Sequence, residues 1–396
     1  MLETEISTTT HSLVESLEEV ISSTRSGQAG PVALAKELGL DKVLTSRLLK
    51  AMRAADPISA AHAMPGPEPL RRFVRAAARH NVPPTVAGKA HAAIDTFEAM
   101  IRDRLGDRSQ LDAVLSAWVP DARREFELRR KQTAFRAIAQ LKGIQAGVLM
   151  ATAVIHPSAS ASHSDVVWVN GMQGVYRVRP GVTAKLTTRR MTPTGAARAP
   201  ETLDGTPVTD ASHLLLKDFC SQPAPAIDVR RNGDVMSYLL GGDAFGAASA
   251  SDVVFAEVSR ADLPRFVAKG SNRLSYFFAE VTPPSEVLQF DVLVHKSLYP
   301  GQDPTLRLYD TALEGVASPN DPARDVDRLD VLESIEPLGE GLQRARSGDV
   351  PRYTELLRRV MDSVGWNASE FRGYRCRVTY PLYGSQVMMC FRAVEE

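Results

Sequence analysis

Apolar residues in the first 155 positions recur at the spacing of a helix. Leu13, Leu17 and Val20 fall on one stripe, which predicts a first helix. Pro31 stands at a favourable first-turn position for a second helix over 32–38, and Gly39 is suited to end that helix. The chain therefore begins as a series of amphipathic helices.

Asp41 is suited to cap the N-terminus of a third helix, which we expect to run from Lys42 to about Arg53. The same spacing predicts further helices over 70–80, 86–105 and 121–155. In the last of these, Gly143, Gly147 and Ala151 lie four residues apart. Small residues at that spacing suit either tight packing in a core or a helix seam between two copies of the chain.

Beyond residue 155 the apolar residues alternate or form short β-rich blocks. Residues 156–164 have the composition of a linker. Asn170-Gly171 and Asn232-Gly233 each predict a hairpin between the blocks on either side, and a last hairpin is predicted between 374–380 and 386–392. We also expect strands over 253–258, 274–281, 287–295 and 306–309, helices over 213–220 and 352–364, and loops over 190–211 and 316–328.

These patterns predict an α+β protein, in which an all-α N-terminal part precedes an antiparallel-β-rich α+β domain. The expected division is a helical domain over 1–83, a helical connector that dimerises over 84–156, and an α+β sensor or interaction domain over 165–396.

Composition excludes several classes of protein. Of the 396 residues, 44% are hydrophobic and 24% are charged, so global disorder, collagen and a bare coiled coil do not fit. Basic and acidic residues are equal at 47 each, which excludes a uniformly basic nucleic-acid-coating protein. Over 26–80, however, basic residues outnumber acidic ones, and a polyanion would be steered to that segment.

Cysteine content and the N-terminal sequence indicate a soluble, cytoplasmic protein. Three cysteines are too few for a disulfide-stapled secreted protein. The acidic, amphipathic N-terminus does not resemble a signal peptide, and the most apolar stretch, 143–155, is too short to cross a bilayer. No spacing suits a metal site, a phosphate-binding loop or a nucleophilic triad, so we expect no catalytic residue, no cofactor and no metal.

The segment 32–53 carries the most specific signal. Ala35 is a small residue where two helices would cross, Gly39 would open the turn, and Leu34, Leu38, Leu48 and Leu49 would form the buried ridge between the helices. On these residues the segment resembles the helix-turn-helix of bacterial transcription regulators, especially the winged-helix types. The resemblance implies a DNA-binding domain over 1–83. A helix-turn-helix also serves as a dimerisation module in small-molecule methyltransferases, so the shape alone does not establish DNA binding.

In such a motif the second helix presents its outward residues to base edges in the major groove. The outward residues expected here are Lys42, Val43, Thr45, Ser46, Arg47, Lys50 and Arg53. Arg47 suits a bidentate contact to guanine, Thr45 and Ser46 suit hydrogen bonds to phosphates or bases, and the remaining cations suit the phosphate backbone.

Two further sets of residues are open to more than one interpretation. Arg71, Arg72 and Arg75 share a helix face that is either solvated or makes additional phosphate contacts. If the last hairpin turns about Tyr383, Cys376 and Cys390 face each other as a possible redox pair; the alternative is two ordinary buried cysteines.

The leading hypothesis is therefore a dimeric, sequence-specific transcription regulator. Its partners would be double-stranded DNA, a second copy of the chain and a small-molecule effector, with no membrane. The alternatives are an adaptor that binds proteins through 121–142, and a small-molecule enzyme that uses the helix-turn-helix only to dimerise.

Overall fold

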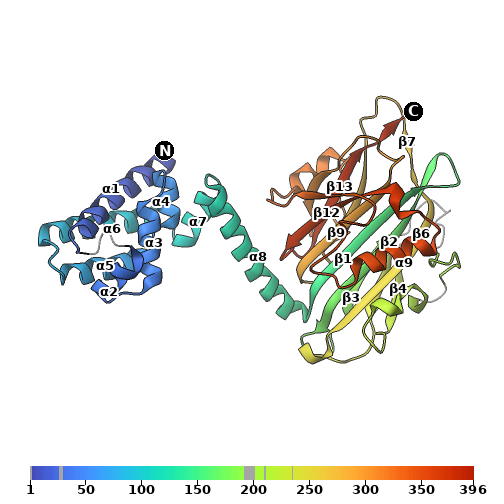
Figure 1. Ribbon diagram of the computed structural model, residues 1–396, viewed down its shortest axis with the longest axis horizontal. Helices are drawn as coiled ribbons and strands as arrows, with labels where there is room; N and C mark the ends of the chain where they lie inside the picture. Colours follow the sequence, from blue (N-terminus) through green and yellow to red (C-terminus); the bar gives the residue numbers. More distant parts are fainter. Residues whose placement is uncertain (1, 26–29, 191–200, 209–210, 234) are drawn as a thin grey trace. The chain divides into compact units, whose positions relative to one another are not determined.

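The computed structural model describes residues 2–25, 30–190, 201–208, 211–233 and 235–396. The chain divides into two compact units, Met1–Arg129 and Arg130–Glu396, which we call the helical unit and the β unit. The expected fold class is confirmed: a helical N-terminal region is followed by a strand-rich region with antiparallel sheets (Figure 1).

The described residues of the helical unit form helices and turns and contain no strand. The helices are α1 (Leu2–Ser22), α2 (Pro31–Leu38), α3 (Lys42–Met52), α4 (Pro57–Ala63), α5 (Pro67–Ala78), α6 (Pro84–Arg104), α7 (Arg108–Ser116) and α8 (Pro120–Lys142), whose last turns belong to the β unit. The stripe predicted for the first helix is buried, and Leu13, Leu17 and Val20 lie in one core with Leu34 and Leu48.

The predicted helix over 121–155 is wrong in its second half. α8 ends at Lys142, Gly143 adopts a left-handed conformation (φ 72°), and Ile144–Pro157 is a strand. The strand is buried on both faces and reads as a continuous apolar run, so its sequence has no alternation to distinguish it from a helix. The small residues therefore have other roles: a Cβ on Gly143 would lie 2.5 Å from a methyl group of Val182.

The β unit has four groups of paired strands among its described residues. The strands are β1 (Ile144–Pro157), β2 (His163–Arg177), β3 (Ala184–Arg190), β4 (Ile227–Asn232), β5 (Val235–Leu240), β6 (Ser251–Pro264), β7 (Phe266–Val267), β8 (Leu274–Glu280), β9 (Ser285–His295), β10 (Thr305–Asp310), β11 (Ile335–Glu340), β12 (Phe371–Thr379), β13 (Ser385–Arg392) and β14 (Val394–Glu395). The largest sheet has the order β11-β12-β9-β1-β2-β6, and β1 and β9 are its parallel pair.

Alternate residues of this sheet face two cores. On one face Val148, Met150 and Val154 pack under helix α9 (Tyr353–Ser363), as expected from the predicted helix over 352–364. On the other face Leu149, Ala151 and other residues of β1 pack against the β10-β13-β8 and β3-β5-β4 sheets. The β unit is thus a layered structure with a helix on one outer face (Figure 1).

The prediction for Asn232-Gly233 is confirmed, because β4 and β5 pair antiparallel around it. The prediction for Asn170-Gly171 is wrong: both residues lie inside β2, paired with β1 and β6. A Cβ on Gly171 would lie 2.7 Å from the carbonyl oxygen of Val253, so this glycine permits close approach of two strands rather than a turn.

Two other expectations are corrected. The predicted linker over 156–164 is the end of β1, a short turn and the start of β2, so it joins two neighbouring strands of one sheet. In place of the helix over 213–220 the structure has two 3₁₀ turns, Ala211–Leu214 and Lys217–Phe219.

Candidate nucleic-acid interface

Helices α2 and α3 form the two-helix unit expected from the sequence. Gly39 adopts the left-handed conformation that ends α2, and the amide of Leu40 donates to the carbonyl of Ala35 at 2.9 Å. The carboxylate of Asp41 caps α3 by accepting from the amide of Val43 at 2.9 Å. Ala35 and Leu48 are both buried, and Gly39 forms the turn. All three residues expected to pack this two-helix unit therefore lie where the sequence predicts.

The outer face of α3 is exposed. We define the α3 outer face as Lys42, Val43, Ser46, Arg47, Lys50 and Arg53, each of which is exposed. Among the described residues, the side chains of its four cations form no hydrogen bond or ion pair within the chain. These charges are free to meet an external anion.

Thr45 was expected on this face, and the expectation is wrong. Its side chain is fully buried, and its hydroxyl donates to the carbonyl oxygens of Pro31 at 2.9 Å and Lys42 at 3.1 Å. Thr45 precedes an outward residue, Ser46, and follows an inward one, Leu44, so it lies at the margin of the inward stripe. The bond to Pro31 satisfies a buried hydroxyl and links α3 to the start of α2.

The arginines of α5 are partly committed to carboxylates. The guanidinium of Arg71 lies 2.6 Å from Asp95 and 2.5 Å from Glu98, both on α6. These bonds raise the pKa of Arg71 and lower that of Glu98. Arg75 pairs with Glu68 at 2.5 Å, which leaves Arg72 as the exposed member of the set without an ion pair in the described chain. A phosphate contact by Arg71 or Arg75 would have to displace an existing partner.

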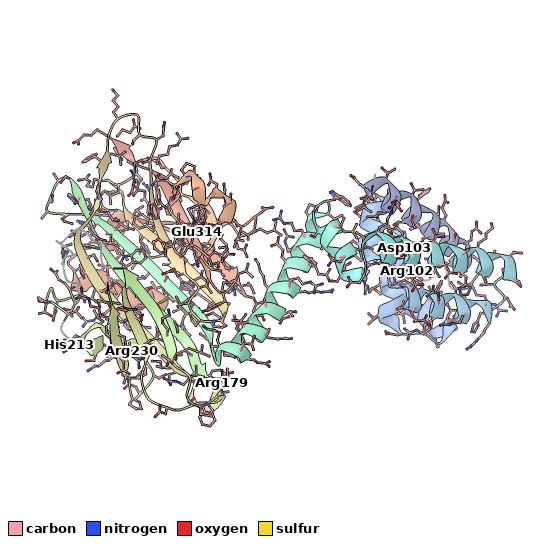
Figure 2. All side chains as sticks on the ribbon, turned by 180° about the vertical axis from the view of Figure 1, so that it is seen from behind. Arg102, Asp103, Arg179, His213, Arg230 and Glu314 are labelled. Atoms are coloured by element: carbon pink, nitrogen blue, oxygen red, sulfur yellow. The ribbon has the colours of Figure 1, made fainter. Side chains whose placement is uncertain are left out.

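The last turn of α6 also contains an arginine that is paired with a carboxylate. Arg102 donates to its neighbour Asp103 at 2.8 Å on the surface of the helical unit (Figure 2). Exposed arginine alone therefore does not distinguish a binding surface in this unit. The α3 outer face differs from the Arg71, Arg75 and Arg102 positions because, among the described residues, none of its four cations is paired.

A partly buried polar cluster lies behind α3. Arg108 donates to the carbonyl oxygens of Ala61 at 2.9 Å and His62 at 3.1 Å, and to Asp112 at 3.0 Å. His62 lies 3.6 Å from Glu125. Burial lowers the pKa of Arg108 and of His62, and the carboxylates of Asp112 and Glu125 oppose that effect only in part.

The described residues of the helical unit form no strand-turn-strand wing, which the winged-helix resemblance implies. After α3 the described helical unit continues as α4, α5, α6 and α7. Pro57 and Pro67 each occupy the first turn of a helix, where the missing amide is tolerated. The proline-rich stretch after α3 therefore starts helices rather than interrupting strands.

The two cysteines expected to face each other do not. β12 pairs with β11 and β9, whereas β13 pairs with β10 and β8, so these strands do not form a hairpin. Cys376 and Cys390 consequently lie in different sheets and different cores, and both are free. Burial raises the pKa of each thiol to about 12, which disfavours the reactive thiolate.

The β unit contains a buried polar network that sequence analysis missed. Arg375 of β12 forms a two-point ion pair with Asp291 of β9, with bonds of 2.9 Å and 2.7 Å. Tyr353 of α9 lies within 2.7 Å of the Thr152 hydroxyl, and the Arg375 guanidinium lies 5.3 Å from the Tyr353 ring centroid. Burial raises the pKa of Asp291 and of Tyr353. The network joins strands and helix, and its fully buried members have no access to a ligand.

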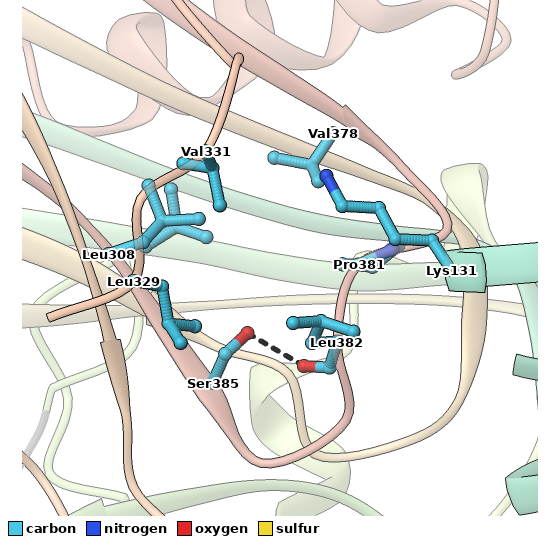
Figure 3. Close-up of a pocket in the computed structure, with 9 residues that line it drawn as sticks. Lys131, Leu308, Leu329, Val331, Val378, Pro381, Leu382 and Ser385 are labelled. Atoms are coloured by element: carbon cyan, nitrogen blue, oxygen red, sulfur yellow. Dashed lines mark hydrogen bonds between the residues drawn. The ribbon is translucent and has the colours of Figure 1, made fainter. Parts of the chain in front are cut away.

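A small apolar pocket lies beside Lys131, in the middle of α8, in the part of this helix that belongs to the β unit (Figure 3). Its lining comprises Lys131, Leu308, Leu329, Val331, Val378, Pro381, Leu382, Ser385 and Val387. Its cavity volume is about 10 Å³, roughly the space of one water molecule, which is far below the range of ligand sites. Lys131 is paired with Glu333 at 2.5 Å, so its charge is compensated.

Histidines meet aromatic rings at the end of β1. His156 stacks on Trp366 with ring centroids 4.8 Å apart, and His295 lies 4.9 Å from His156. Within the described ranges, no group of three or more histidine, cysteine or acidic residues is arranged to hold a metal ion.

Among the described residues, no helix combines the length and apolar character needed to cross a bilayer.

Comparisons with protein-family models, curated proteins and solved structures found no match to this chain. Sequence analysis located the α3 outer face, because its residues are adjacent in the chain. It missed the Arg108 and Arg375 clusters, because their partners come from distant segments and no local spacing signals them.

Proposed function

We propose that this protein is a sequence-specific DNA-binding transcription regulator that acts in the cytoplasm. The α3 outer face carries the proposal. It is an exposed helix face whose four cations are unpaired among the described residues, and it is held by a two-helix unit in which the N-terminus of α3 is capped. Such a helix can enter the major groove, where its first turns reach base edges and its flanking cations meet phosphates.

Within this proposal the residues have distinct roles. Arg47, in the second turn, is positioned for a bidentate contact to the O6 and N7 atoms of guanine. Ser46 beside it can hydrogen-bond a base or a phosphate. Lys42, Lys50 and Arg53 contact the backbone, and Arg72 supplies a further phosphate contact from α5.

One such helix gives weak binding, so we propose that the protein acts as a dimer with its two α3 helices about one DNA turn, or roughly 34 Å, apart. The β unit would serve as the sensing part, through an effector that favours one spacing of those helices.

The decisive experiment is selection of DNA from a random duplex pool by the purified full chain, followed by fluorescence anisotropy on the selected duplex. We expect Arg47→Ala to weaken specific binding by roughly 1–3 kcal/mol and to relax the preference at one guanine. The matched control is Arg230→Ala, which removes an exposed arginine of β4 (Figure 2) and should leave affinity unchanged.

Recovery of no preferred duplex, or equal losses in the two variants, would count against DNA recognition by α3. If DNA is not retained while the chain associates with a protein, the adaptor hypothesis takes its place.

A further inference from the structure

An aliphatic side chain stands among the cations of α3. Val43 is 63% exposed and lies between Lys42 and the turn that carries Ser46 and Arg47. A single exposed valine is ordinary on a protein surface. This one occupies the first turn of α3, which is the part of a recognition helix that reaches base edges.

We propose that Val43 is a specificity-determining residue that reads the methyl group of thymine in the major groove. The inference rests on the proposed function and specifies the DNA that this site selects. Thymine is the base that presents a methyl group in that groove, and apolar side chains recognise it there. The other side chains of the α3 outer face end in a charge or a hydroxyl group, so Val43 is its wholly apolar side chain.

The local structure holds Val43 in place. Its amide donates to the Asp41 carboxylate at 2.9 Å, which fixes the first turn of the helix. Because valine is branched at Cβ, its side chain is also restricted to few rotamers in a helix. The methyl groups therefore point in a set direction before DNA is bound.

The spacing of Val43 and Arg47 predicts the sequence read. Four residues along a helix return to the same face and rise about 6 Å. Successive base pairs are about 3.4 Å apart, so the two side chains reach positions no more than about two base pairs apart. Each half-site should then contain a thymine within about two base pairs of the guanine contacted by Arg47.

The test uses the duplex selected from the random pool, with each thymine replaced singly by deoxyuridine, which lacks only the methyl group. We expect one position in each half-site to bind about fourfold more weakly after replacement, the loss expected for one buried methyl group. Val43→Ala should weaken binding to the unmodified duplex by about fourfold to tenfold. Replacement at that position should then change the affinity of the variant by less than twofold, because the contact is already absent.

Val32→Ala is the matched control. Val32 is 59% exposed and lies on α2 instead of α3, so this variant should keep the full sensitivity to deoxyuridine. A selected duplex that tolerates deoxyuridine at every thymine, or that shows the same sensitivity with Val43→Ala, overturns the inference and leaves DNA binding intact. Failure to select any duplex would instead overturn the proposed function.

Discussion

Two sets of basic side chains, one in each unit, have opposite roles. On the α3 outer face of the helical unit, Arg47 and Lys50 are exposed and unpaired among the described residues. In the β unit, Arg177, Arg324 and Arg375 are buried, and each donates to backbone carbonyl groups that belong to loops or strand ends. One set of cations faces solvent, and the other set holds the fold together.

The difference shows why charge counts along a sequence do not locate a binding surface. A buried arginine contributes to the formal charge of the β unit, yet its guanidinium already has partners within the chain. Arg71 of α5 is intermediate, because it lies near the surface but pairs with Asp95 and Glu98. The useful quantity is the number of exposed cations without a partner, and a structure is required to obtain it.

The largest expected effect concerns the buried pair of the β unit. Arg375→Met should lower the free energy of unfolding by about 3–5 kcal/mol, because it leaves the carboxylate of Asp291 buried without its partner. Urea denaturation followed by circular dichroism measures this loss. The loss should be smaller at acidic pH, where protonation of Asp291 removes the uncompensated charge.

The double variant Arg375→Met, Asp291→Leu is the control for that loss. It removes both charges together and should regain much of the lost stability. A double variant as unstable as the single one would show that Arg375 acts through its bonds to the carbonyl groups of Ala345 and Arg346, rather than through the ion pair.

On the α3 outer face the corresponding substitution should spare the fold. Lys50→Ala should change the free energy of unfolding by no more than about 0.5 kcal/mol, because Lys50 is exposed and unpaired among the described residues. In DNA titrations at several salt concentrations, it should reduce the slope of log K against log salt by about 1, the loss of one phosphate contact.

Lys269→Ala removes the same charge from an exposed position in the β unit and should leave that slope unchanged. If Lys50→Ala and Lys269→Ala reduce the slope equally, DNA binding depends on the total charge of the chain and not on the α3 outer face.

Local sequence pattern predicts the structure of the helical unit better than that of the β unit, for a physical reason. In the helical unit the spacing that predicts a helix also determines which residues are buried, so the burial of Leu48 follows from local pattern. The end of α2 at Gly39 and the cap of α3 at Asp41 follow from local pattern as well. The exception is Thr45, whose burial depends on a hydrogen bond to Pro31 in another helix.

In the β unit the pairing of strands is a long-range property. Adjacent strands β12 and β13 join different sheets, so the expected contact between Cys376 and Cys390 does not form. β1 was assigned to a helix because a strand buried on both faces has no alternation. Strand segments could be predicted from composition, but their partners could not.

The smallest expected effect concerns a titratable group behind the α3 outer face. His62 is surrounded by Glu125, Asp112, Arg108 and Lys50, and burial is the largest factor that lowers its pKa below the ordinary value of 6.5. As the pH falls through about 6.5, the unfolded chain takes up a proton that the folded chain resists, so the free energy of unfolding decreases until the folded pKa is passed. Above pH 6.5 His62 is neutral in both the folded and the unfolded chain, so it adds no pH dependence to the free energy of unfolding.

His62→Gln should therefore make the stability of the helical unit less dependent on pH between the folded pKa and 6.5, as measured by urea denaturation across that range. His11→Gln is the matched control, because it removes a histidine of the same unit whose side chain is 63% exposed. Equal pH dependence in His62→Gln and the parent chain would mean that the Glu125 carboxylate offsets burial. The helical unit would then compensate a buried charge in the same way as the β unit compensates Arg375.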